Sequence, residues 1–196
     1  MGFRISWIGS DQTTRDDMLA RLNLAATDEI DEANEAPFSV ASLPGGWTIL
    51  WSNDFAFATP DLCRGLSMGG RILACYVHET VMASHAAMYD RGLDIWTTYH
   101  NSQGGLFDLH AKGTLPDAYA PIKEHQWAAQ ESEGGDQANV DHIFDIPVKT
   151  AEALCGYRYD KWRFDWGSPT FYIARRLPDV ATAPARHGFL SRIFRR

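Results

Sequence analysis

The residues best suited to chemistry are three histidines and one aspartate in the middle of the chain. Imidazole nitrogens and a carboxylate can together bind a divalent transition metal or share a proton. All four residues fall in segments that the pattern predicts to be neighbouring strands, so their side chains could meet. They are His85, His100, Asp108 and His110. The chemistry that they would support is metal-assisted hydrolysis.

The strand register decides whether these four side chains converge, and the sequence does not fix the register. A shift of one residue moves a side chain to the opposite face of a sheet, so His85 and His110 could point in opposite directions. Histidines scattered over a solvated sheet are more often plain polar positions than ligands. We therefore expect no bound metal and no cofactor, and we keep the hydrolase as the alternative hypothesis.

Other catalytic patterns fail on spacing. His78-Glu79 would need a second histidine four positions after His78 to form a zinc-binding helix motif, but Met82 stands there. The paired glycines lack the spacing of nucleotide-binding loops and suit turns instead. The cysteines form no C-x-x-C pair and are interpreted as small buried hydrophobes; they are Cys63, Cys75 and Cys155. We expect a protein without enzymatic activity in a reducing compartment, the cytoplasm.

The elements that would position the histidines give the clearest structural pattern. Apolar, β-branched and aromatic runs alternate with turn residues over residues 71–112, which predicts a central antiparallel β-meander. The turn after the second strand is expected at residues 90–92. The predicted strands are residues 72–77, 81–89, 93–100 and 106–112.

The remaining segments predict a larger sheet with short helices packed on it. Further strands are expected at residues 3–8, 38–43, 47–52, 162–166 and 171–173. Helices are expected to begin near Thr13, at Pro60, within residues 117–121 and at Pro147. The predicted fold class is therefore α+β. Residues 1–177 would form a single domain, an antiparallel sheet packed by three or four short helices.

The charge of the chain is acidic and unevenly distributed. The 196 residues include 18 basic and 25 acidic side chains, which give a net charge of −7. Residues 186–196 hold four arginines and no acid, so residues 1–185 carry 14 basic and 25 acidic side chains, a net charge of −11. A body of this sign disfavours nucleic acid as a partner and favours a basic protein.

Five of the carboxylates cluster in residues 27–36, where no basic residue occurs. A run of this kind is typical of a solvated segment, and we expect an exposed loop or a frayed helix. We predict that these carboxylates bind and steer a basic protein partner. They are Asp28, Glu29, Asp31, Glu32 and Glu35.

The end of the chain has a different composition from the body. Residues 178–185 are rich in proline and alanine and predict a linker to a basic amphipathic C-terminal tail at residues 186–196. The tail could contact the acidic body, a partner or a membrane surface, so a scaffold or membrane-surface protein is a second alternative. No apolar run approaches the roughly 20 residues of a transmembrane helix. The predicted contact residues are Phe189, Leu190, Arg192, Ile193, Phe194, Arg195 and Arg196.

The general profile of the chain is similar to that of the immunity proteins that neutralise bacterial toxins. The similarity lies in size, acidity, the seven tryptophans and the lack of a catalytic motif, without a shared sequence motif. It implies a non-enzymatic, acidic protein-binding domain that covers a basic protein partner. This is the function that the sequence favours.

Overall fold

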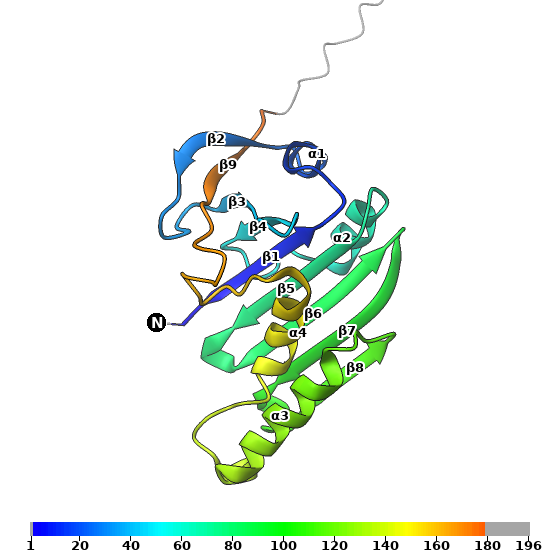
Figure 1. Cartoon of the computed structure of the whole chain (residues 1–196), viewed down its shortest axis with the longest axis vertical. Coiled ribbons are helices and arrows are strands. Elements are labelled where there is room, and N and C mark those ends of the chain that lie inside the picture. Colours follow the sequence, from blue (N-terminus) through cyan, green and yellow to red (C-terminus); the bar gives the residue numbers. More distant parts are fainter. Residues whose placement is uncertain (1, 179–196) are drawn as a thin grey trace, which may run out of the picture.

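A computed structural model describes residues 2–178, and within them the chain forms a nine-stranded antiparallel sheet with helices on both faces (Figure 1). The order of strands across the sheet is β2-β9-β3-β4-β1-β5-β6-β7-β8. The strands are β1 Arg4–Ser10, β2 Leu24–Ile30, β3 Phe38–Ser42, β4 Thr48–Ser52, β5 Ile72–His78, β6 Ala83–Asp90, β7 Leu93–Asn101, β8 Leu109–Gly113 and β9 Tyr172–Arg176. The helices are α1 Arg15–Arg21, α2 Pro60–Ser67, α3 Tyr119–Ser132 and α4 Asp145–Cys155. The α+β prediction is confirmed.

The predicted meander is present as four consecutive antiparallel strands, β5 to β8. Arg91 and Gly92 join β6 to β7, and both have positive φ angles, 50° and 79°. Two positive φ angles are the signature of a type I′ turn, whose twist suits a tight hairpin. The joint between β5 and β6, which lacks glycine, is a short 3₁₀ turn at Glu79–Val81.

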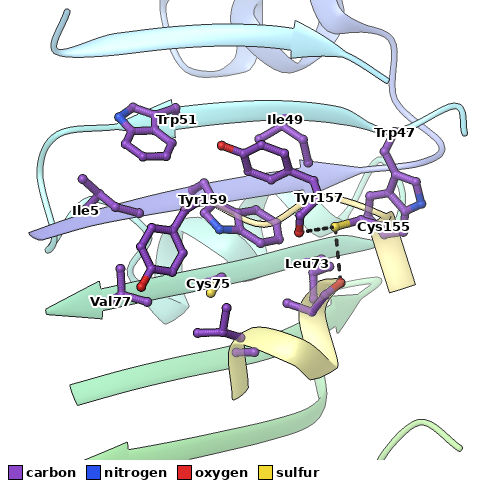
Figure 2. Packing of buried hydrophobic residues seen from close by; sticks show 14 of the residues in the cluster. Ile5, Trp47, Ile49, Trp51, Leu73, Cys75, Val77, Cys155, Tyr157 and Tyr159 are labelled. Carbon is purple, nitrogen blue, oxygen red and sulfur yellow. Dashed lines mark hydrogen bonds between the residues drawn. The ribbon is translucent and has the colours of Figure 1, made fainter. Parts of the chain in front are cut away.

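The central strands β1, β4 and β5 are buried on both faces, which explains their long apolar runs. Trp7 packs on the face covered by α4, whereas its neighbour Ile8 packs on the face covered by α1 and α2. In β5, Leu73 and Cys75 join the α4 side, and Ile72 joins the opposite side. Figure 2 shows the α4 side, where Tyr157 and Tyr159 lie over the sheet with Leu73 and Cys75. Residues 156–171 therefore act as part of the layer that covers this face.

All three thiols belong to these apolar layers. Cys63, Cys75 and Cys155 are free and buried. Burial raises the pKa of Cys63 and of Cys155 to about 12, and it raises the pKa of Cys75 as well. The Cys155 thiol donates a hydrogen bond to the backbone oxygen of Ala151, 3.3 Å away (Figure 2). The structure thus gives the thiols a packing role and keeps them protonated.

Two predicted segments differ from the structure. Residues 27–36 were expected as a loop or frayed helix, but β2 extends to Ile30 because it pairs with β9. Residues 162–166 form no strand; Phe164 and Gly167 make only an isolated bridge. The alternating aromatics there stack on each other instead, with the rings of Phe164 and Trp166 4.8 Å apart.

The C-terminal predictions fall mostly outside the described residues. These are the linker at residues 178–185, apart from Pro178, and the tail at residues 186–196. Within residues 2–178, none of the helices combines the length and apolar character needed to cross a bilayer.

Candidate functional site

The four residues of the hypothetical hydrolase site lie on opposite faces of the sheet. His85 pairs with Tyr99, and Tyr99 pairs with His110, so His85 and His110 share the face that α1 and α2 partly cover. His100 follows Tyr99 and therefore points to the α4 face. Over residues 2–178, no group of three or more histidine, cysteine, aspartate or glutamate side chains is placed to hold a metal.

His100 forms a fully buried pair with a residue that the sequence did not indicate. Its Nε2 lies 2.8 Å from a carboxylate oxygen of Asp141, and its Nδ1 lies 2.9 Å from the backbone oxygen of Asp108. The side chains of His100 and Asp141 are 0% and 5% exposed. The Asp108 backbone oxygen can only accept, so Nδ1 carries a hydrogen and donates it, while Nε2 and the Asp141 carboxyl group share the second hydrogen bond. It fastens β7 to the segment before α4, out of reach of a substrate.

Asp108 and His110 form a separate, exposed pair at the edge strand β8. His110 Nε2 lies 2.7 Å from an Asp108 carboxylate oxygen, and the His110 side chain is 69% exposed. The His110 ring also stacks over Tyr99, with ring centroids 6.5 Å apart. Such an exposed pair contributes little to stability, and among the described residues no further histidine, cysteine, aspartate or glutamate joins it to form a metal site.

His85 is held in a tight aromatic contact on the same face. Its ring stacks on Tyr76 with centroids 4.5 Å apart, and its Nε2 lies 2.8 Å from the Thr97 hydroxyl. Burial lowers the pKa of His85 from 6.5 to about 4, because desolvation penalises the charged ring. His85 is therefore neutral at physiological pH.

Acidification is expected to weaken the fold through His85. The unfolded chain protonates this histidine near pH 6.5 and the folded chain only near pH 4. As the pH falls between these values, the unfolded state binds more protons, so the free energy of unfolding drops by up to about 3 kcal/mol from this group. His85→Phe keeps the stacking and cannot titrate, so its stability should fall less between about pH 7 and about pH 4 in urea unfolding. If the free energy of unfolding changes equally with pH in the wild type and in His85→Phe, the lowered pKa of His85 is wrong.

The strongest candidate for a binding site lies between the acidic segment and residues 157–171. It is a cleft of about 360 Å³, here called the acidic cleft. Two of its walls are large apolar side chains that water reaches: Ile30 is 56% exposed and Trp162 is 58% exposed. The residues that line it are Ile30, Asp31, Glu32, Asn34, Tyr157, Tyr159, Lys161, Trp162, Ser168, Pro169, Thr170 and Phe171.

The two tyrosines of the cleft are neutral. Burial raises the pKa of Tyr157 and of Tyr159, and the phenol of Tyr159 donates a hydrogen bond to the Glu79 carboxylate 2.7 Å away. Tyr157 packs edge-on against Trp7 with ring centroids 5.6 Å apart. This part of the cleft is thus a rigid aromatic surface anchored in the core.

The charge of the cleft is negative because its basic residue is already paired. Lys161 Nζ lies 2.5 Å from a Glu152 carboxylate oxygen. Among the described residues, Asp28, Glu32 and Glu35 have no ion-pair partner. Glu29 is paired with Arg175, 2.8 Å away. Glu32 therefore brings an unneutralised carboxylate to a cleft with apolar walls.

Asp31 does not belong to the exposed patch that the sequence predicted for it. The residue is 8% exposed, and its carboxylate accepts hydrogen bonds from the backbone amides of Glu35 and Ala36, at 2.9 and 3.0 Å, and from the Ser39 hydroxyl. Its own amide donates to the Phe171 backbone oxygen at 2.9 Å. Asp31 is a structural residue that shapes the turn after β2, whereas Asp28, Glu29, Glu32 and Glu35 are exposed.

The apolar walls of the cleft could not be found from sequence. Ile30 interrupts an acidic run, and Trp162 occupies an alternating aromatic pattern that favours a strand. The two come together only because β9 inserts between β2 and β3. Comparison of the chain with protein-family models, curated protein sequences and solved structures found no match.

Proposed function

We propose that this protein is a non-enzymatic binding domain whose acidic cleft holds a basic protein partner. The observation that carries the proposal is the juxtaposition of exposed Ile30 and Trp162 with the Glu32 carboxylate, which no basic residue within residues 2–178 pairs with. Exposed tryptophan is enriched at the centres of protein interfaces, where it supplies large contact area at little cost in side-chain entropy. Neighbouring carboxylates steer a partner of opposite charge toward such a centre.

The net charge of residues 1–185, −11, supports the same partner class. A body with a large negative net charge raises the association rate with a basic protein and repels nucleic acid. The general profile shared with bacterial immunity proteins is consistent with this mode of action. We place the protein in the cytoplasm, because three free, buried thiols suit a reducing compartment.

Retention experiments with matched variants test the proposal. The immobilised protein is expected to retain proteins of basic isoelectric point from a bacterial lysate, as identified by mass spectrometry. Trp162→Ala should weaken binding of the retained protein roughly 30-fold or more, as expected for an interface centre. Glu32→Gln should chiefly slow its association at low salt. Met68→Ala is the control, because Met68 is also an exposed apolar residue but lies beyond the end of α2, which packs on the other face.

Two outcomes would overturn the proposal. In one, the retained proteins are acidic. In the other, Trp162→Ala retains the same proteins with the same affinity as Met68→Ala, which would place the interface elsewhere. Both variants alter exposed side chains, so circular dichroism should show unchanged folding for each.

A further inference from the structure

The composition of residues 186–196 is complementary to the acidic cleft. This segment contains four arginines, no acid and four large apolar residues. The cleft offers the opposite set of features: the Glu32 carboxylate, apolar walls at Ile30 and Trp162, and the buried aromatic side chains of Tyr157 and Phe171. The chain therefore carries, within itself, a peptide with the chemistry that the cleft is proposed to bind.

The point where the described chain ends allows this segment to reach the cleft. Leu177 donates its amide to the backbone oxygen of Asn23, so the chain leaves the sheet beside the beginning of β2. From there β2 runs alongside β9 to Ile30 at the cleft, as Figure 1 shows for the two strands. The seven residues of β2 cover about 20 Å, and residues 179–185 can span about 23 Å when extended.

The side chains of the segment match the cleft in kind. An arginine has an apolar stem and a planar cationic head, so it can lie against the Trp162 indole while its guanidinium meets the Glu32 carboxylate. Phenylalanines such as Phe189 and Phe194 can cover Ile30, removing apolar surface from water. Lys161 does not oppose the cationic segment strongly, because Glu152 neutralises it.

We propose that residues 186–196 dock in the acidic cleft of their own chain and compete there with a basic partner. The inference rests on the proposed function, since it gives the same site an internal occupant. A short tether holds such a segment at an effective concentration of about 1 mM, so a weak contact is enough to fill the cleft. If the segment fills the cleft in nine-tenths of the molecules, only one-tenth can bind an added basic ligand, and the apparent affinity for that ligand falls about tenfold.

The experiment uses the full chain and a variant with Arg192→Gln, Arg195→Gln and Arg196→Gln. The indole N–H signals of the tryptophans are recorded by NMR, and the Trp162 signal is assigned with Trp162→Phe. The Trp162 signal is expected to differ between wild type and the triple variant, whereas that of Trp127, on α3, stays in place. A synthetic peptide of residues 186–196 added to the triple variant should return the Trp162 signal toward its wild-type position.

Binding of that peptide gives the second measurement. It should bind the triple variant about tenfold more tightly than wild type, because the variant no longer fills its own cleft. A peptide with the same arginines replaced by glutamine is the control and should not move the Trp162 signal. Docking is wrong if the Trp162 signal is the same in wild type and the triple variant. If basic proteins still depend on Trp162 for retention in that case, the proposed function stands and only the internal occupant is excluded.

Discussion

Replacing His100 with alanine is expected to lower the free energy of unfolding by about 3–5 kcal/mol, because it leaves the buried Asp141 carboxyl group without the ring nitrogen that it contacts at 2.8 Å. The imidazole also donates to the Asp108 backbone oxygen, so the substitution removes a second buried hydrogen bond and opens a cavity. Asp141→Ala should cost a similar amount, since it leaves two buried groups without a partner: the Nε2 of His100 and the Phe144 amide, which donates a hydrogen bond to Asp141 at 3.0 Å.

Asp141→Asn tests the hydrogen bonds of Asp141 apart from its charge, because asparagine can form hydrogen bonds but carries no charge. If His100 releases its Nε2 proton and keeps Nδ1–H on Asp108, the asparagine amide can donate to Nε2 while its oxygen accepts from Phe144. Both hydrogen bonds then survive, and the cost should stay below about 1 kcal/mol. Urea unfolding at neutral pH measures all three variants, with His110→Ala as the exposed control. A loss of stability for His100→Ala as small as that for His110→Ala would show that the pair does not hold the fold.

The meander could be predicted from sequence because its pairing is local. Each strand of β5 to β8 pairs with the next, and the cue at Asp90 to Gly92 marks a tight turn. The strand register could not be predicted, because no local signal in the sequence fixes whether His100 and His85 face the same side of the sheet. The difference in burial between the two faces fixes it in the structure, because Trp96 and Thr98 on the α4 face are buried while Thr97 and Tyr99 on the other face are only half-buried.

Long-range pairing was beyond the sequence pattern. β9 comes from the end of the described chain and inserts between β2 and β3, so β2 extends to Ile30 although residues 27–30 begin the acidic run. The partner of His100, Asp141, lies 41 residues away, ahead of the helix predicted to begin at Pro147 and outside the predicted strands. The acidic cleft also depends on pairing between distant segments, since the insertion of β9 beside β2 brings Trp162 close to Ile30. Pairing energies of this kind arise from tertiary packing, which composition alone does not encode.

Asp31→Ala is expected to lower the free energy of unfolding by about 4 kcal/mol, although Asp31 sits among carboxylates that contribute almost nothing. Its carboxylate accepts from two backbone amides and from the buried Ser39 hydroxyl, so the substitution leaves three donors without an acceptor. Hydrogen bonds to a charged acceptor are the stronger kind, which raises the loss above that of three ordinary bonds at a surface.

Glu32→Gln and Glu35→Gln are the matched controls for Asp31→Ala, because both side chains are exposed and belong to the same acidic run. Each should change stability by less than about 0.5 kcal/mol in urea unfolding. The turn that the Asp31 carboxylate holds borders the acidic cleft, so Asp31→Ala should loosen the cleft and weaken any ligand bound there, while Glu32→Gln should alter binding in a folded cleft. Equal stability of Asp31→Ala and Glu32→Gln would return Asp31 to the solvated patch that the sequence predicts, and the turn would then need another anchor.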